Sequence, residues 1–331
     1  MRIQSKRNIT FISVALCICI IIIAGFYFQG KDERILELKV LNVKDEEDLG
    51  AVSTLSVKLT NLGFSSIEPK FSIMWSHIPY YWKVVEGPQL VPARSSAIYK
   101  LETDMIQAII PNGETFIVRV NDIRSTVFST SKPTKVNLKD LPLILNSRFE
   151  HWLIDYSTKQ RRPFRWDVWD DKGSGDTASV SQETVEGRNC LKIYVVQDGV
   201  KDNHAWATEH VRQEIEFPTS VIGLWVYPTF TYQGGDNPQN VFGIETHDGT
   251  NIIWFIFSDK NEGIYDLPNH RVIVTKAPLN EWSYHEIDIS KEYRKLGLST
   301  PKKLDFMAIV GGHQALPGTY TGYFADIASV Q

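Results

Sequence analysis

An unbroken apolar run near the start of the chain constrains the fold most strongly. Residues 9–28 carry no charge and no proline, and the run ends in three consecutive aromatic residues, Phe26, Tyr27 and Phe28. A helix rises about 1.5 Å per residue, so about 20 apolar residues cross the ~30 Å hydrocarbon core of a bilayer. The run also lacks the polar face of a surface helix in a soluble domain. The sequence therefore predicts a transmembrane helix over residues 9–28.

The charges that flank this run predict its orientation. Three basic residues and no acid precede it, whereas Lys31 and Arg34 follow it directly and are offset by Asp32 and Glu33, with an acidic stretch at residues 45–48. Basic residues favour the cytoplasmic side, so residues 1–8 are predicted to be a cytoplasmic tail and the bulk of the chain extracellular. The alternative is a cleaved signal peptide, which would have a shorter apolar region of ~7–15 residues and small residues at the cut. We therefore favour a single-pass anchor in the cell membrane.

Composition narrows the classes of partner. The chain has 331 residues, 43% hydrophobic and 22% charged, with a net charge of −4. An acidic balance argues against nucleic acid as a partner. Of the three cysteines, two lie in the predicted span and only Cys190 lies beyond it, so the extracellular part can form no internal disulfide. We interpret Cys190 as a small buried residue in a strand.

The first region after the anchor has the pattern of an all-β domain. Residues 35–43 and 53–60 alternate apolar and polar side chains, as half-buried strands do. Short strands at this spacing, separated by turns rich in proline and glycine, predict an immunoglobulin-like β-sandwich over residues 31–134. The phrase at residues 57–69 resembles spacer immunoglobulin-like domains of prokaryotic surface proteins. The other expected strands of this sandwich cover residues 70–75, 96–101 and 114–120. A polar linker is expected to follow it at residues 135–141.

The second region, residues 142–331, is also rich in predicted strands. Eight or more strands over ~190 residues predict a two-sheet jelly roll. Residues 251–257 are apolar at nearly every position, which predicts a central strand covered on both faces. One short helix is expected at residues 290–296, with Ser290 as its cap. The expected strands cover residues 189–196, 208–217, 221–227, 241–246, 251–257, 271–275, 283–289, 305–310 and 321–330.

Phrases at both ends of this region suggest a family. The chain reads Leu-Asn-Ser-Arg-Phe-Glu-His-Trp at residues 145–152, Pro-Phe-Arg-Trp at 163–166, and Gly-Tyr-Phe-Ala-Asp-Ile-Ala-Ser-Val at 322–330. These phrases resemble carbohydrate-binding modules with the galactose-binding-like jelly-roll fold. The resemblance implies a jelly roll that binds glycans.

The same resemblance implies a structural calcium ion. In such modules calcium often joins the first strand to the last, and Glu150 and Asp326 match the two carboxylate positions. Calcium takes 6–8 oxygen ligands, so two carboxylates at neighbouring strand ends suit it. The alternative is that both are solvated charges at strand ends, and Ala325 stands where the family has a second Asp.

The resemblance also implies that aromatic rings stack on sugar rings. We consider Trp169 and five further residues as candidates, and we take those five as the predicted carbohydrate site. Trp225 and Tyr227 lie two apart on one predicted strand, so they share a face. The polar loop at residues 229–240 is expected to rim the site. For Trp152, Trp166 and Trp282, which stand in fold-defining phrases, we favour a place in the core. The predicted carbohydrate-binding residues are Trp206, Trp225, Tyr227, Tyr232 and Trp254.

The sequence gives no sign of catalysis. Glu245, Asp248, Glu286 and Asp288 are available, but none stands in a known catalytic phrase, and the histidines lack metal-ligand spacing. The sequence therefore predicts a non-enzymatic, membrane-anchored, extracellular protein that binds surface or wall glycans. One alternative is an accessory subunit that binds a protein, such as a surface-layer component, at the outer face of the membrane. The other is a glycan-cleaving enzyme, which needs two carboxylates across a groove.

Overall fold

The structure is a computed structural model, and it describes most of the chain from residue 36 onward. The predicted tail and transmembrane helix, residues 1–28, lie outside the described residues. Within the described part, no helix has the length and apolar character needed to cross a bilayer. The described ranges are residues 36–44, 50–75, 77–124, 128–138, 141–199, 206–216, 221–234, 238–260, 262–267, 270–313 and 317–330.

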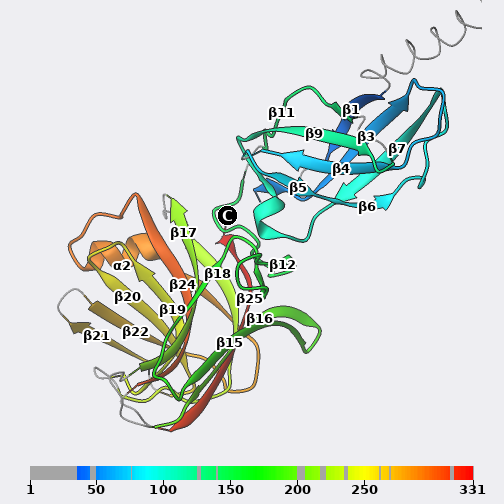
Figure 1. Cartoon of the computed structure of the whole chain (residues 1–331). Coiled ribbons are helices and arrows are strands. Elements are labelled where there is room, and N and C mark those ends of the chain that lie inside the picture. The colour runs from blue at the N-terminus through cyan, green and yellow to red at the C-terminus, as the bar shows by residue number, and fades with distance from the viewer. Residues whose placement is uncertain are drawn as a thin grey trace, which may run out of the picture. The chain divides into compact units, whose positions relative to one another are not determined.

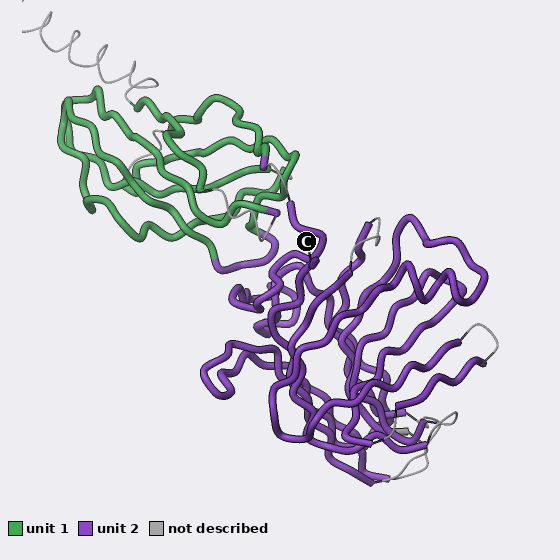
Figure 2. The backbone as a smooth tube through the Cα atoms, turned by 180° about the vertical axis from the view of Figure 1, so that it is seen from behind, with its two compact units in different colours: residues 1–45, 51–103, 108–137 green, residues 46–50, 104–107, 138–331 purple. Residues whose placement is uncertain are grey.

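The chain divides into two compact units (Figure 2). Unit 1 comprises residues 1–45, 51–103 and 108–137, and unit 2 comprises residues 46–50, 104–107 and 138–331. Both units are built from strands, so the predicted all-β class is confirmed for the described residues. The helices among these residues are the single α-helix α2 (Ile289–Lys295) and the 3-10 turn η3 (Ile106–Ala108).

Unit 1 has two main sheets that pack face to face. Phe71 of β4 contacts Tyr99 of β7 with ring centroids 4.9 Å apart, and both rings are buried. The two-residue strands β2 (Ala51–Val52) and β8 (Ile110–Pro111) pair separately. One sheet has the order β1 (Leu36–Val43), β3 (Thr54–Asn61), β7 (Ser95–Glu102), β6 (Lys83–Glu86), and the other has β10 (Phe128–Thr130), β9 (Thr115–Asp122), β4 (Pro69–Met74), β5 (Pro79–Tyr81), with β11 (Thr134–Lys135) also on β9.

Unit 2 is a larger sandwich of a seven-stranded and a five-stranded sheet (Figure 1). A short hairpin of β12 (Trp152–Ile154) and β13 (Arg161–Pro163) precedes them. The seven-stranded sheet has the order β14 (Asp167–Asp171), β17 (Trp206–Glu216), β24 (Lys303–His313), β19 (Asn240–His247), β20 (Ile252–Ser258), β22 (His270–Lys276), β21 (Gly263–Leu267). The five-stranded sheet has the order β15 (Thr177–Val185), β16 (Arg188–Gln197), β25 (Gly318–Val330), β18 (Val221–Pro228), β23 (Ser283–Ile287).

The main core of unit 2 lies between these two sheets. Phe242 of β19 and Phe324 of β25 meet across it, with centroids 4.8 Å apart. Trp166 is 2% exposed, packs 5.1 Å from Phe149, and donates its Nε1–H to the Leu145 carbonyl over 3.1 Å. The predicted core places of Trp152 and Trp166 are therefore confirmed. Trp282 differs, because it is half-buried and donates its Nε1–H to the Val185 carbonyl outside the main core.

The strand that is apolar on both faces has the position its sequence predicts. β20 lies between β19 and β22 inside the seven-stranded sheet. Alternate side chains point to opposite faces, so Phe255 joins the main core while Trp254 joins a second apolar cluster on the outer face. The helix starts one residue earlier than predicted, because Asp288 rather than Ser290 caps it by accepting from the Lys291 amide over 2.8 Å.

We predict that Trp166→Ala destabilises unit 2 strongly. Removing a fully buried tryptophan leaves a cavity and costs ~3–5 kcal/mol of the free energy of unfolding. The matched control is Trp169→Ala, three residues on, whose side chain is 43% exposed and whose loss should cost about 1 kcal/mol. Denaturant unfolding followed by circular dichroism measures both. Equal losses for the two variants would contradict this account of the core.

Candidate functional site

The five predicted carbohydrate-binding residues do not form one site. Trp206, Tyr232 and Trp254 gather on the outer face of the seven-stranded sheet, where they belong to or pack on the second apolar cluster. Trp225 and Tyr227 alternate along β18 with main-core residues, so they lie on the outer face of the five-stranded sheet instead. The shared face predicted for Trp225 and Tyr227 is correct. The two groups lie on opposite sides of the sandwich.

Trp225 and Tyr227 are held by their own neighbours. The Arg188 guanidinium lies over the Trp225 ring at 4.1 Å from its centroid, and the Tyr284 ring packs at 5.5 Å. Tyr227 contacts two other rings edge-on, Trp282 at 5.3 Å and Tyr323 at 5.6 Å. Arg188 thus covers one face of Trp225, and Tyr227 packs against two rings, so we base the candidate site on the more exposed Trp169 instead.

The outer face of the seven-stranded sheet carries the candidate site. Cross-strand register places Trp169 of β14 opposite His210 of β17 and Trp206 four residues before His210 on the same strand. On the far strands, Glu245 faces Trp254, Trp254 faces Val272, and Val272 faces Tyr265. We call this surface the aromatic face, and its rings are those of Trp169, Trp206, His210, Tyr232, Trp254 and Tyr265.

Trp169 is the most exposed ring of the aromatic face. Its indole is 43% exposed and stacks flat on the His210 imidazole, with centroids 3.8 Å apart and planes 2° from parallel. His210 is buried, and this burial lowers its pKa to about 4, so the imidazole is neutral near pH 7. One face of the indole is thus fixed by the imidazole. Sequence reasoning left Trp169 out of the predicted site and missed His210, because nothing local to either residue shows that two strands place them together.

Trp254 supports the middle of the aromatic face. It is 7% exposed, and its Nε1–H donates to Glu245 Oε2 over 2.8 Å. Burial raises the pKa of Glu245. Trp206 packs edge-on against Trp254 with centroids 5.8 Å apart and is half-buried. Trp206 and Trp169 therefore offer ring surface to a ligand, whereas Trp254 is a buried support.

Polar groups flank these rings. Arg212, two residues after His210 on β17, pairs with Asp305 over 2.7 Å, and both side chains are half-buried. The predicted rim loop is described at residues 229–234 and 238–240. There the Asn240 amide donates to the Thr231 carbonyl over 2.9 Å and accepts from the Gln233 amide over 2.8 Å, which fixes the loop beside buried Tyr232. The face therefore combines rings with paired charges.

The predicted calcium residues line one small cleft, but its side chains do not fit a calcium ion. Asp326 is ion-paired with Arg188, and Glu150 is exposed. Arg148, Arg188 and a third carboxylate, Glu186, line the same cleft, so two guanidinium groups already balance most of its negative charge. Within the described residues, no group of three or more His, Cys, Asp or Glu side chains is placed to hold a metal ion.

The carboxylates considered for catalysis have structural partners. Glu245 accepts from Trp254, and Asp288 caps α2. Asp248 accepts from the backbone amides of Thr250 and Asn251 over 2.8 and 2.7 Å, which closes the β19–β20 turn and lowers the Asp248 pKa. Each of these three carboxylates therefore has a structural partner in unit 2.

Comparison with known proteins adds only distant likenesses. No protein-family model and no curated protein matches the chain. Among solved structures, TmCBM61 in complex with β-1,4-galactotriose is 15% identical, covering 58% of this chain and 99% of that one with a TM-score of 0.31. A carbohydrate-binding module of the β-sandwich superfamily is 11% identical over 89% and 98%, with a TM-score of 0.32. The family 11 module of cellulase Lic26A-Cel5E from Clostridium thermocellum is 10% identical over 50% and 87%, with a TM-score of 0.29. Values of this size assign neither a fold family nor a ligand to this chain.

We predict that calcium does not stabilise unit 2. A bound ion at 100 times its dissociation constant would raise the free energy of unfolding by about 2.7 kcal/mol, but the arginines of this cleft oppose such binding. Thermal unfolding with millimolar calcium and with EDTA should give the same midpoint. Arg188→Gln should lower the midpoint, since it removes the pair with Asp326 and the contact with Trp225. A midpoint that rises with calcium would contradict the prediction.

Proposed function

We propose that this chain is a non-catalytic carbohydrate-binding protein and that unit 2 binds a neutral glycan on the aromatic face. The observation that carries the proposal is the exposed Trp169 ring, held flat on a buried, uncharged imidazole. A ring fixed in this way is already oriented and loses little conformational freedom when a ligand packs on it. The apolar face of a pyranose ring is the partner that suits such a surface.

The spacing of the rings supports a ligand with more than one sugar. Trp206 and His210 are four residues apart on β17, and Trp169 stacks on His210, so the half-buried Trp206 ring and the exposed Trp169 ring are separated by about 13 Å along the strand. Across the sheet, the seven strands make six steps of ~4.8 Å, or about 29 Å from β14 to β21. A chain of several sugars suits these dimensions better than a single one.

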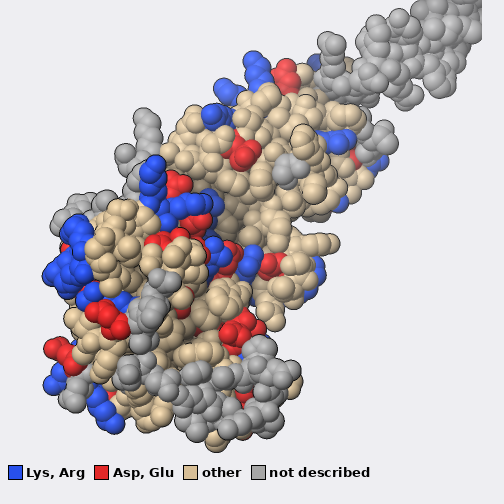
Figure 3. Space-filling model, turned by 90° about the vertical axis from the view of Figure 1, so that its left-hand side faces the viewer, with Lys and Arg blue, Asp and Glu red and all other residues tan. Residues whose placement is uncertain are grey.

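The charge distribution supports a neutral ligand. Arg212 and Asp305, the charged pair beside His210, neutralise each other. Figure 3 shows basic and acidic side chains interspersed on the side of unit 2 that it draws, rather than gathered in a patch of one sign. A strongly charged polymer would need such a patch.

We further propose that unit 1 is an immunoglobulin-like spacer and that residues 9–28 anchor the chain with both units outside the cell. Taken in chain order, the strands of unit 1 give the sheet orders A-B-E-D and G-F-C-C′, which supports an immunoglobulin-like assignment. The anchor is supported by the apolar sequence alone.

A second candidate function is that of an accessory subunit that binds a protein. It is favoured by large apolar side chains on the surface of unit 1, where Phe64 is 77% exposed, Tyr81 61% and Ile98 60%. Exposed rings and aliphatic side chains of this size are common in protein interfaces. This function would use unit 1 and would leave the aromatic face of unit 2 without a role.

The test of the proposed function is glycan-array binding, followed by calorimetric titration of the strongest glycan. Trp169→Ala and Trp206→Ala should each weaken binding at least about tenfold, or ~1.4 kcal/mol, because each removes a stacking surface. The matched control is Trp225→Ala, a tryptophan on the opposite sheet, which should leave the affinity unchanged.

Two results would count against the proposal. Weaker binding by a folded Trp225→Ala variant would move the site to the five-stranded sheet. No saturable binding to any glycan by the folded protein would favour the protein-binding alternative.

A further inference from the structure

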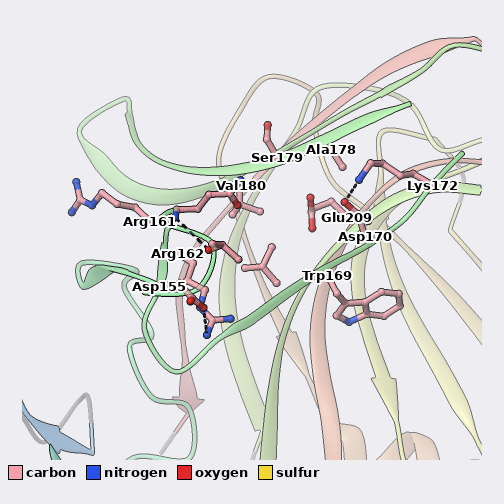
Figure 4. Close-up of a pocket in the computed structure, with 13 residues that line it drawn as sticks. Asp155, Arg161, Arg162, Trp169, Asp170, Lys172, Ala178, Ser179, Val180 and Glu209 are labelled. Atoms are coloured by element: carbon pink, nitrogen blue, oxygen red, sulfur yellow. Dashed lines mark hydrogen bonds and ion pairs between the residues drawn. The ribbon is translucent and has the colours of Figure 1, made fainter. Parts of the chain in front are cut away.

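A cleft of about 600 Å³ opens at one lateral edge of unit 2 and borders the aromatic face at Trp169, which is one of its lining residues (Figure 4). Its volume lies within the usual range for small-molecule sites. The cleft lies between two edge strands, β14 of the seven-stranded sheet and β15 of the five-stranded sheet. The segment that contains β13 forms a third side, with Arg161 and Arg162 in the lining.

The alternation of side chains along β14 determines which of its residues form the floor of this cleft. Trp169 stacks on His210 on the outer face, so its neighbours Val168 and Asp170 point to the inner side. Val168 packs against the main core, as do Ala178 and Val180 of β15. The floor of the cleft is therefore apolar, and its walls carry polar and charged groups.

Glu209 of β17 is the unusual group in this cleft. Its side chain is 3% exposed, and its buried Oε1 has no hydrogen-bond partner among the described residues. Figure 4 shows the carboxyl group directed into the space between β14 and β15. The carboxyl group interacts with the His210 backbone, but a buried oxygen without a partner still costs stability, which an apolar residue at the same position would not.

The other charged groups of the cleft are largely paired with one another. On the β13 side, Asp155 pairs with Arg162 over 2.9 Å and accepts from Ser157, which lowers the Asp155 pKa to about 2. On the β14 side, Asp170 pairs with Lys172. Arg161 donates to the Trp152 carbonyl over 3.0 Å. The lining residues of β15, Ala178, Ser179 and Val180, carry no charge.

Glu209 is mainly uncharged near pH 7. Burial, and in second place the charge of Asp170 directly opposite on β14, raises the pKa of Glu209 to about 8. A neutral carboxyl group has an O–H that donates and a carbonyl oxygen that accepts. It can therefore satisfy a hydroxyl group without bringing a net charge into the cleft.

We infer that this edge cleft is a second ligand site, one that takes a small neutral polyhydroxy compound such as a single sugar unit, with Glu209 hydrogen-bonded to one of its hydroxyl groups. Two of the three lining cations, Arg162 and Lys172, are already paired with carboxylates, and the third, Arg161, donates to the Trp152 carbonyl, so an anionic ligand would compete with these contacts. A hydroxyl-rich ligand can leave both pairs in place, supply the missing partner of Glu209 and lay its C–H groups on Val168 and Val180. Apart from Trp169, which borders the cleft, the rings of the aromatic face are not part of its lining.

The experiment uses the full protein carrying Trp206→Ala, which weakens the aromatic face and keeps Trp169, a lining residue of the cleft. Glucose, galactose, mannose, xylose and glycerol serve as probes in protein-detected NMR titrations at pH 6 and pH 9. At least one probe should saturate at pH 6 and bind about tenfold more weakly at pH 9, where roughly one Glu209 in ten keeps its proton. In the same background, Glu209→Leu should lose this binding, and Glu209→Gln should keep it without the pH dependence.

Stability gives an independent control that the variants fold. Below about pH 4.5 Glu209 is protonated in both states, but between about 4.5 and 8 only the folded state holds the proton. The stability contributed by this protonation is therefore lost as the pH rises through about 8. Glu209→Gln and Glu209→Leu should raise the unfolding midpoint more at pH 9 than at pH 5. Glu245→Gln, another buried glutamate on the other side of the sheet, should leave probe binding at the cleft unchanged.

Three outcomes would overturn the inference. The first is the absence of saturable binding by any probe. The second is binding that Glu209→Leu leaves intact, and the third is equal affinity at pH 6 and pH 9. The glycan array and the affinities of Trp169→Ala and Trp206→Ala test the aromatic face, whereas the Glu209 variants test the cleft. Failure of one set of measurements therefore leaves the other proposal standing.

Discussion

Unit 2 depends on one constraint: the seven-stranded sheet must cover apolar side chains on both of its faces. β20 is apolar at nearly every position and lies inside that sheet, so burial against the five-stranded sheet satisfies only alternate residues. The others need a second layer, and large rings supply it, with Trp254 and Tyr232 closing over Val241, Ile256 and Ile309. The aromatic face is thus first a cover for the sheet. Its outermost rings, Trp169 and Trp206, keep surface that no other side chain buries, and this surface is available to a ligand.

The sequence predicted the regular parts of this fold well, because they rest on local patterns. The β-class and the burial of Trp166 follow from alternation and from fold-typical phrases. The central place of β20 follows from its apolar composition. The short edge strands β14 and β15 were not predicted, since they carry polar residues at nearly every second position and sit where one side meets solvent. Strands of this kind owe their conformation to their partners more than to their own residues.

The candidate site was only partly predictable for a related reason. Residue type identifies Trp206, Trp225 and Trp254 as aromatic, but the face on which each lies depends on which strands pair and in which register. Trp225 and Trp254 lie on the outer faces of two different sheets. Which strand joins which sheet cannot be read from a short stretch of sequence. The stack of Trp169 on His210 joins positions 41 residues apart across the β14–β17 pair. The sequence likewise does not show that Glu209 is buried with an unpaired oxygen, because this depends on how β14, β15 and β17 pack together.

The edge strand β14 has a consequence for the way unit 2 responds to ligands. It has five residues and only β17 as a bonded neighbour within the sheet, and it presents Trp169 to one side and Asp170 to the other. A strand with a single partner is among the elements that open at least cost. A compound that immobilises β14 from one side reduces the conformational entropy that a second ligand must remove when it binds on the other side. Thermodynamic linkage makes such cooperativity reciprocal, so two ligands that never touch would report on each other through a single short strand.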